Sequence, residues 1–257
     1  MATTGGNLAK SGFPTMNDSR GSVSRRLDAG AVLFALVLPT LVTLVYFVLL
    51  ADYPTGIGRA AYSVGKFVQF AFPLVWVLAV QRRRLRLRLP DRRGLPEGIA
   101  FGVFVLAAML VLYHVWLGPA GLLDAAAEEV GGVLTRFGMD TPLKFLALGA
   151  FISLLHSLLE EYYWRWFVFG ELRRMVSLRP AVVISSLGFM AHHVLLLGKY
   201  FDGLSPATVV FSLAVAVGGG VWAWIYHRSD SLYGPWLSHL LLDAAIFLVG
   251  YHMVFGA

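Results

Sequence analysis

Seven runs of about twenty apolar residues constrain the fold of this chain more than any other feature, because a helix of that length crosses the ~30 Å hydrocarbon core of a bilayer. The runs lie at about 30–50, 62–80, 97–117, 143–164, 180–199, 205–226 and 236–255. Of the 257 residues, 58% are hydrophobic and only 14% are charged, which is more apolar surface than one core of this size can bury. The expected fold class is all-α, a polytopic transmembrane helix bundle of about seven spans.

The charged residues predict how these spans are oriented. Seven Arg lie within 82–93, and further Arg residues precede the first run and follow the fourth and sixth runs, whereas acidic residues gather within 119–141. By the positive-inside rule, the N-terminus and the 82–93 loop are cytoplasmic. We expect this loop to contact anionic lipid headgroups and not a nucleic acid. The pattern is typical of an integral protein of a prokaryotic cytoplasmic membrane, and the absence of Cys excludes a disulfide-stabilised module.

Composition divides the chain into three parts. Residues 1–29 are rich in Gly, Ser and Thr and lack an apolar run, so we expect a disordered cytoplasmic tail. Residues 30–142 hold three membrane helices, the basic loop and an outer amphipathic segment at 119–141. Residues 143–257 form the remaining membrane bundle, which carries the polar residues of interest.

Ionisable residues within membrane spans are costly and usually functional, and here they gather in the last four spans, whereas the first two carry almost none. In the segment HSLLEEYYWR, Glu161 and Arg165 are four residues apart and are expected to pair on one helix face. Glu160 points about 100° away and has no evident cation beside it. It is therefore the candidate general base, although a salt-bridged helix end is an equally simple reading. His156, one turn earlier, is better explained as a packing residue.

Two further spans contribute histidines. In SSLGFMAHHVLLL, His193 follows Ser185 and Phe189 at intervals of four residues, so this stripe is expected to face the bundle interior. His192 is rotated from that stripe and is expected to make interhelical hydrogen bonds. In the last span, His239 and Asp243 are four apart, so the carboxylate can lie beside the ring.

The order of these motifs, EExxxR, FxxxH and HxxxD, resembles the CAAX protease and bacteriocin-processing family of intramembrane endopeptidases. The resemblance covers residues 143–255. It implies hydrolysis of a peptide bond in a membrane-anchored protein or peptide, such as a prenylated C-terminus, a propeptide or a C-terminal anchor. Three departures stand out: Trp166 replaces a frequent Gly, Asp243 stands where Asn is also frequent, and the span count is seven where eight is common.

The resemblance also implies roles for the polar residues. Glu160 activates water, His193 orients it, and Glu161 with Arg165 holds the helix end. His239 and Asp243 either stabilise the oxyanion or join Glu160 and His193 around a metal such as zinc, since the family is described both as metalloproteases and as glutamate proteases. We favour protease activity without a firmly bound metal.

Two other functions fit the same sequence. A catalytically silent scaffold, immunity or secretion partner would keep the polar cluster for helix association. A proton-coupled transporter would use it as a proton relay, but its two halves would be expected to match, and here the polar groups lie in the C-terminal half alone.

Overall fold

The computed structural model describes residues 16–50, 55–84 and 92–256, and every regular element within them is a helix. Seven helices in this part of the chain are long and apolar enough to cross a membrane. The prediction of an all-helical, seven-span membrane bundle is thus confirmed. The Arg-rich loop falls largely on residues 85–91, outside the described residues.

Three of the seven spans combine an α-helix with a short π-helical end. The first three are α1 (Met16–Leu44) with η1 (Val45–Leu49), α2 (Thr55–Val75) with η2 (Trp76–Val80), and α3 (Leu95–Leu112) with η3 (Tyr113–Leu117). The fourth is composite: α5 (Pro142–Phe151), η4 (Ile152–His156), α6 (Ser157–Glu161), η5 (Tyr162–Phe169) and α7 (Gly170–Met175). The last three are α8 (Leu178–Tyr200), α9 (Pro206–Ser229) and α10 (Tyr233–Phe255).

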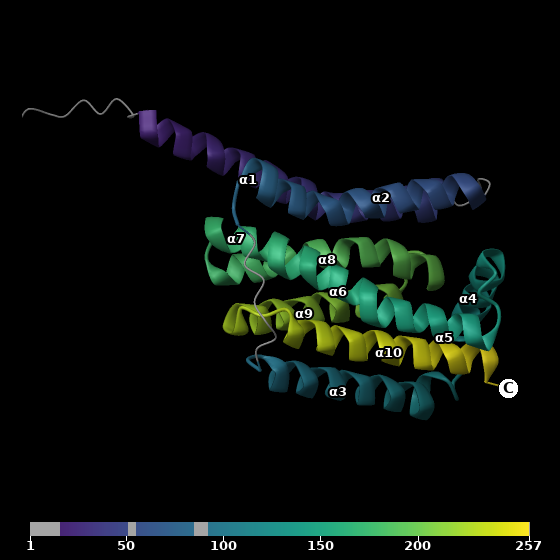
Figure 1. Ribbon diagram of the computed structural model, residues 1–257. Helices are drawn as coiled ribbons and strands as arrows, with labels where there is room; N and C mark the ends of the chain where they lie inside the picture. The colour runs from purple at the N-terminus through teal and green to yellow at the C-terminus, as the bar shows by residue number, and fades with distance from the viewer. Residues whose placement is uncertain (1–15, 51–54, 85–91, 257) are drawn as a thin grey trace, which may run out of the picture.

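The C-terminal spans lie between two N-terminal layers. In Figure 1, α1 and α2 run side by side along one side of the bundle, α3 lies along the opposite side next to α10, and the composite span, α8 and α9 lie between them. A Cβ on Gly98 would overlap the backbone of Gly234, and one on Gly102 would lie 2.9 Å from Cα of Ser238. Small residues therefore allow α3 and α10 to pack with their backbones nearly in contact.

The predicted disorder of residues 1–29 is wrong for residues 16–29, because α1 begins at Met16; residues 1–15 lie outside the described residues. The reason is a tertiary contact near the end of residues 16–29. The carboxylate of Asp28 accepts hydrogen bonds from Trp76 Nε1 at 3.1 Å and Gln81 Nε2 at 2.8 Å. These bonds tie the polar start of α1 to the end of the second span.

The predicted amphipathic segment contains a helix, α4 (Asp124–Phe137), which packs at one end of the bundle beside α8 and α10 (Figure 1). Its Ala126 and Leu134 are buried, and its Glu129 pairs with Lys199 of α8 at 2.7 Å. The start of α1, the end of η2 and α7 lie at the other end. Acidic and basic segments are thus separated by the length of the bundle.

Candidate active site

The composite span positions the two adjacent carboxylates. Its one α-helical turn at the centre, α6, carries Glu160 and Glu161 and is flanked by the π-helical segments η4 and η5. Such segments are rare and often occur at functional sites, because they change the direction of the side chains on either side. Glu160 is 3% exposed and Glu161 is fully buried.

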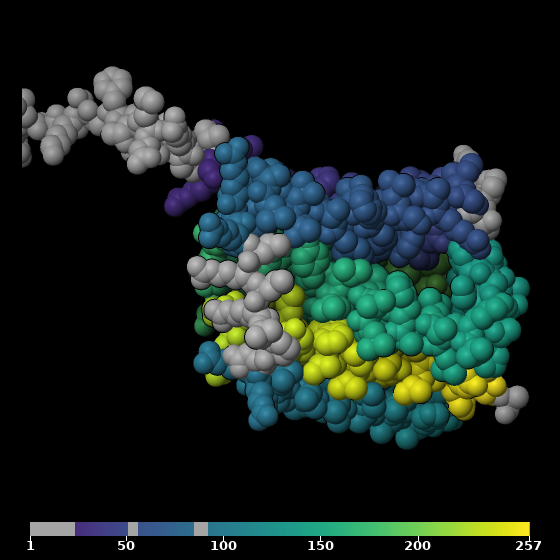
Figure 2. Space-filling view, viewed as in Figure 1, coloured from purple at the N-terminus to yellow at the C-terminus, as the bar shows by residue number. Residues whose placement is uncertain are grey.

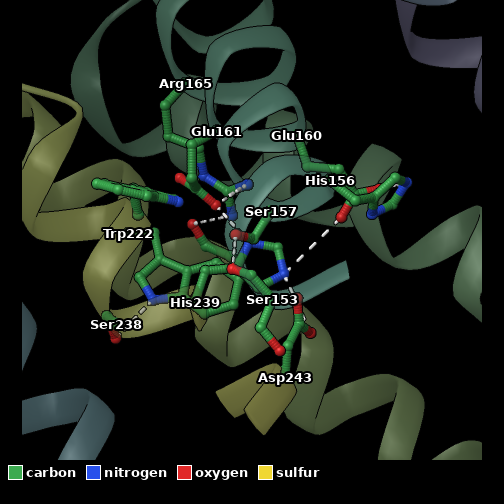
Figure 3. Close-up of polar contacts among 12 residues, drawn as sticks. Ser153, His156, Ser157, Glu160, Glu161, Arg165, Trp222, Ser238, His239 and Asp243 are labelled. Atoms are coloured by element: carbon green, nitrogen blue, oxygen red, sulfur yellow. Dashed lines mark hydrogen bonds and ion pairs between the residues drawn. The ribbon is translucent and has the colours of Figure 1, made fainter. Parts of the chain in front are cut away.

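Glu161 is held from two helices. Arg165 Nη1 lies 3.1 Å from Glu161 Oε1, so the ion pair predicted from the four-residue spacing is present. His239 Nδ1, from α10, lies 2.8 Å from the same oxygen (Figure 3). Because a carboxylate can only accept a hydrogen bond, Nδ1 must carry the proton. Glu161 therefore fixes the orientation of His239 and turns its Nε2 away toward Glu160.

Aromatic rings hold the cation and the imidazole of this network. The Arg165 guanidinium lies 4.6 Å from the ring centre of Phe189 and 4.9 Å from that of Trp222. Trp222 in turn stacks on His239 at 4.3 Å and donates from Nε1 to Ser238 Oγ at 2.9 Å (Figure 3). Sequence reasoning missed Trp222, because an apolar span gives no signal for which aromatic residue meets a polar site.

Three imidazoles surround Glu160, each from a different element. His192 Nε2 of α8 and His156 Nε2 of η4 lie 3.7 and 3.9 Å from its Oε1, and His239 Nε2 of α10 lies 3.8 Å from its Oε2. These separations exceed a direct hydrogen bond but suit a single bridging oxygen atom. His156, expected to be a packing residue, is thus part of the site.

The two neighbouring histidines of α8 exchange the positions that were expected for them relative to Glu160. His192 is buried, stacks on Trp164 with its ring plane tilted by 4°, and faces Glu160. His193 is half-buried, its ring lies 4.2 Å from that of His192, and its Nδ1 lies 2.9 Å from the carbonyl oxygen of Phe189. His193 therefore stands behind His192, and His192 is the imidazole that approaches the carboxylate.

The third motif also reaches the cluster. Asp243 Oδ1 lies 3.7 Å from His239 Nε2, so Asp243 and Glu160 share the same ring nitrogen (Figure 3). Trp166, the departure in the first motif, stacks on Tyr162 with ring centres 5.2 Å apart. No contact of Trp166 with the two carboxylates is present within the described residues.

The proposed metal ligands Glu160, His193, His239 and Asp243 do not form a ligand set. Within residues 16–50, 55–84 and 92–256, no three His, Asp or Glu side chains are arranged to hold a metal ion. His193 Nδ1 is directed at a backbone carbonyl and His239 Nδ1 at Glu161. His193 is thus directed away from the other three side chains, whereas Nε2 of His239 faces Glu160 and Asp243.

Residues 142–245 match the family model described as Type II CAAX prenyl endopeptidase Rce1-like. This part of the chain is therefore similar to Rce1-like endopeptidases. The resemblance to the CAAX protease and bacteriocin-processing family is thereby confirmed for the segment that carries all three motifs, and the family implies a membrane-embedded protease. No curated protein and no solved structure matches the chain.

Proposed function

We propose that this protein is an intramembrane endopeptidase that hydrolyses a peptide bond in a membrane-associated protein or peptide, with Glu160 as general base. Candidate substrates are a prenylated C-terminus, a propeptide and a C-terminal anchor. The observation that carries the proposal is a buried carboxylate facing Nε2 atoms of three imidazoles at 3.7 to 3.9 Å. A purely structural carboxylate would bond its neighbours directly, whereas at these separations one water oxygen beside the pair can bond the carboxylate and an imidazole together.

The reaction follows from what each group can accept or donate. A water between Glu160 and His192 gives one proton to the Glu160 carboxylate as its oxygen attacks the peptide carbonyl carbon. The carbonyl oxygen becomes an oxyanion, which a protonated His239 stabilises by donating from Nε2. Glu160 then transfers the proton to the peptide nitrogen as the C–N bond breaks. A carboxylic acid and an amine leave the site, and Glu160 is again a carboxylate.

The remaining residues act through the groups that react, Glu160, His192 and His239. Glu161 and Arg165 fix the orientation of His239 and of α6, and Asp243 lies beside the same imidazole on its Nε2 side. His193, placed by its motif in the reacting group, here supports the position of His192. Since Glu160 can supply the base and His239 the oxyanion donor, we propose that the reaction needs no bound zinc, so activity should survive exhaustive chelation.

The test is the substitution of Glu160 by Gln, which removes the base and preserves the side-chain shape. We expect turnover to fall by about 10²–10⁴-fold, the range for loss of a positioned general base. The readout is a comparison of protein termini in membranes that contain the wild-type or the E160Q chain. Glu128→Gln, on the exposed face of α4, is the control and should leave the termini unchanged. Identical termini in E160Q and wild-type membranes would favour a catalytically silent protein.

A further inference from the structure

A lysine in the second span lies beside the catalytic network, where its charge acts on Glu160 and His156. Lys66 is half-buried in α2, and its Nζ lies over the rings of Tyr62 and Phe70, 5.7 and 5.4 Å from their centres. Its position is about 15 Å along the helix from Gly56, where the span begins, at 1.5 Å per residue. Among the described residues, Lys66 has no hydrogen-bond or ion-pair partner. An ionisable residue at this depth is usually paired or functional.

A short chain of contacts connects Lys66 with the catalytic carboxylate. The ring of Phe70, one turn after Lys66, meets the ring of His156 edge-on at 6.1 Å. His156 Nε2 lies 3.9 Å from Glu160 Oε1. Figure 2 shows α2 and the composite span in adjacent rows, with a hollow between them toward the α4 end of the bundle. Lys66 thus stands on the face of α2 that borders the site.

Lys66 interacts with Glu160 through its charge, but the two side chains do not form an ion pair at contact distance among the described residues. The imidazoles of His156, His192 and His239 are the groups that face Glu160, and His156 lies between Glu160 and Phe70. The three N–H donors of the ammonium group, held over two aromatic rings, therefore remain for a ligand. The ligand that complements an unpaired cation in a low-dielectric site is an anion.

We propose that Lys66 binds the free C-terminal carboxylate of the peptide segment that is cleaved. This proposal rests on the proposed function. An endopeptidase that cuts close to a C-terminus must hold a negatively charged chain end near its own buried carboxylates, and Lys66 offsets that repulsion. A lipid phosphate is the other source of an anion, but phosphates lie at the ends of the spans and Lys66 lies near the middle. Lys66 would thereby select short C-terminal segments over internal loops.

The test measures binding and needs no turnover, so it can succeed or fail independently of the proposed protease activity. A fluorescent prenylated peptide with a free C-terminal carboxylate, and the same peptide as its C-terminal amide, are titrated against the full chain in phosphatidylcholine nanodiscs. We expect the acid to bind about tenfold more tightly than the amide, because one charge-assisted hydrogen bond distinguishes them. Equal affinity of the wild type for both peptides would overturn the proposal without any variant.

Variants and lipids separate the remaining explanations. Lys66→Met should abolish the preference for the acid, Lys66→Arg should keep much of it, and Lys144→Met should leave it unchanged, since Lys144 pairs with Asp140 at 3.7 Å. If K66M still prefers the acid over the amide, another cation binds the carboxylate, and the proposal is overturned. Addition of phosphatidylglycerol should not change the affinity of the acid. Competition by this lipid in the wild type but not in K66M would assign Lys66 to lipid phosphate instead.

Discussion

The two adjacent histidines of α8 show how a single residue step changes the assignment of a site. Counting in steps of four from Ser185 selects His193, which lies about 80° around the helix from Ser185. Counting seven residues selects His192, which is within about 20° of Ser185. Ser185 and His192 are both buried, and His192 faces Glu160. The seven-residue spacing was therefore the signal that would have found the imidazole beside Glu160.

Substitution of each histidine by Ala tests this assignment. We expect H192A to lower kcat by about 10²-fold or more, because it removes the group that orients water beside the general base. H193A should cost less than about tenfold, since His193 acts through His192. Turnover of a defined peptide in nanodiscs measures both. A larger loss in H193A than in H192A would return the catalytic role to the residue selected by the motif.

Gln69 offers a prediction about stability. This side chain of α2 is fully buried, and neither its Nε2 nor its Oε1 has a hydrogen-bond partner among the described residues. An unpaired buried polar group costs about 1–3 kcal/mol by protein mutational data. Gln69→Met should therefore raise the thermal unfolding temperature in detergent. Gln81→Met should lower it, since Gln81 donates to Asp28 and Glu171 at 2.8 and 2.9 Å. A lower unfolding temperature for Q69M would show that the amide is satisfied in the membrane.

At the scale of elements, hydropathy was sufficient to predict the spans but not their internal geometry. The apolar runs found all seven spanning helices, and the four-residue spacing found the Glu161–Arg165 pair. The π-helical segments η4 and η5 were not predicted, because an extra residue in one turn depends on packing against neighbouring helices. Lys66 was missed for a related reason: one cation in an otherwise apolar helix does not show which neighbour it faces.

The contact between α3 and α10 predicts the effect of adding one methyl group. Gly98→Ala should destabilise the protein by about 1–3 kcal/mol or more, because the new Cβ would meet the backbone of Gly234, which cannot rotate away. Gly131→Ala in α4 is the matched control. No atom lies within 4 Å of its new Cβ, so the higher helix propensity of Ala should stabilise it by about 0.5–1 kcal/mol. Thermal unfolding in one detergent compares the two variants. An unfolding temperature of G98A equal to that of the wild type would refute the close packing.

At the scale of the whole molecule, the separation of charge predicts the orientation in the membrane. Ser177, beside the Arg residues of α7, and Thr135, on α4, are exposed at opposite ends of the bundle. The chain has no Cys, so single substitutions by Cys report one site each. An impermeant maleimide added to intact cells should label T135C but not S177C, because the basic end is expected to be cytoplasmic. The reverse labelling would mean that the bundle has the opposite orientation.

The order of synthesis gives the Glu161–Arg165 pair a role during membrane insertion. His239, the other partner of Glu161, is 78 residues further along the chain and is not yet made when the composite span emerges from the ribosome. Arg165 is one turn away in the same helix, and His156 stands in the same relation to Glu160. Each carboxylate can thus enter the translocon with a partner already beside it. The hydrogen-bond network of the mature site is completed when α10, the last helix, follows.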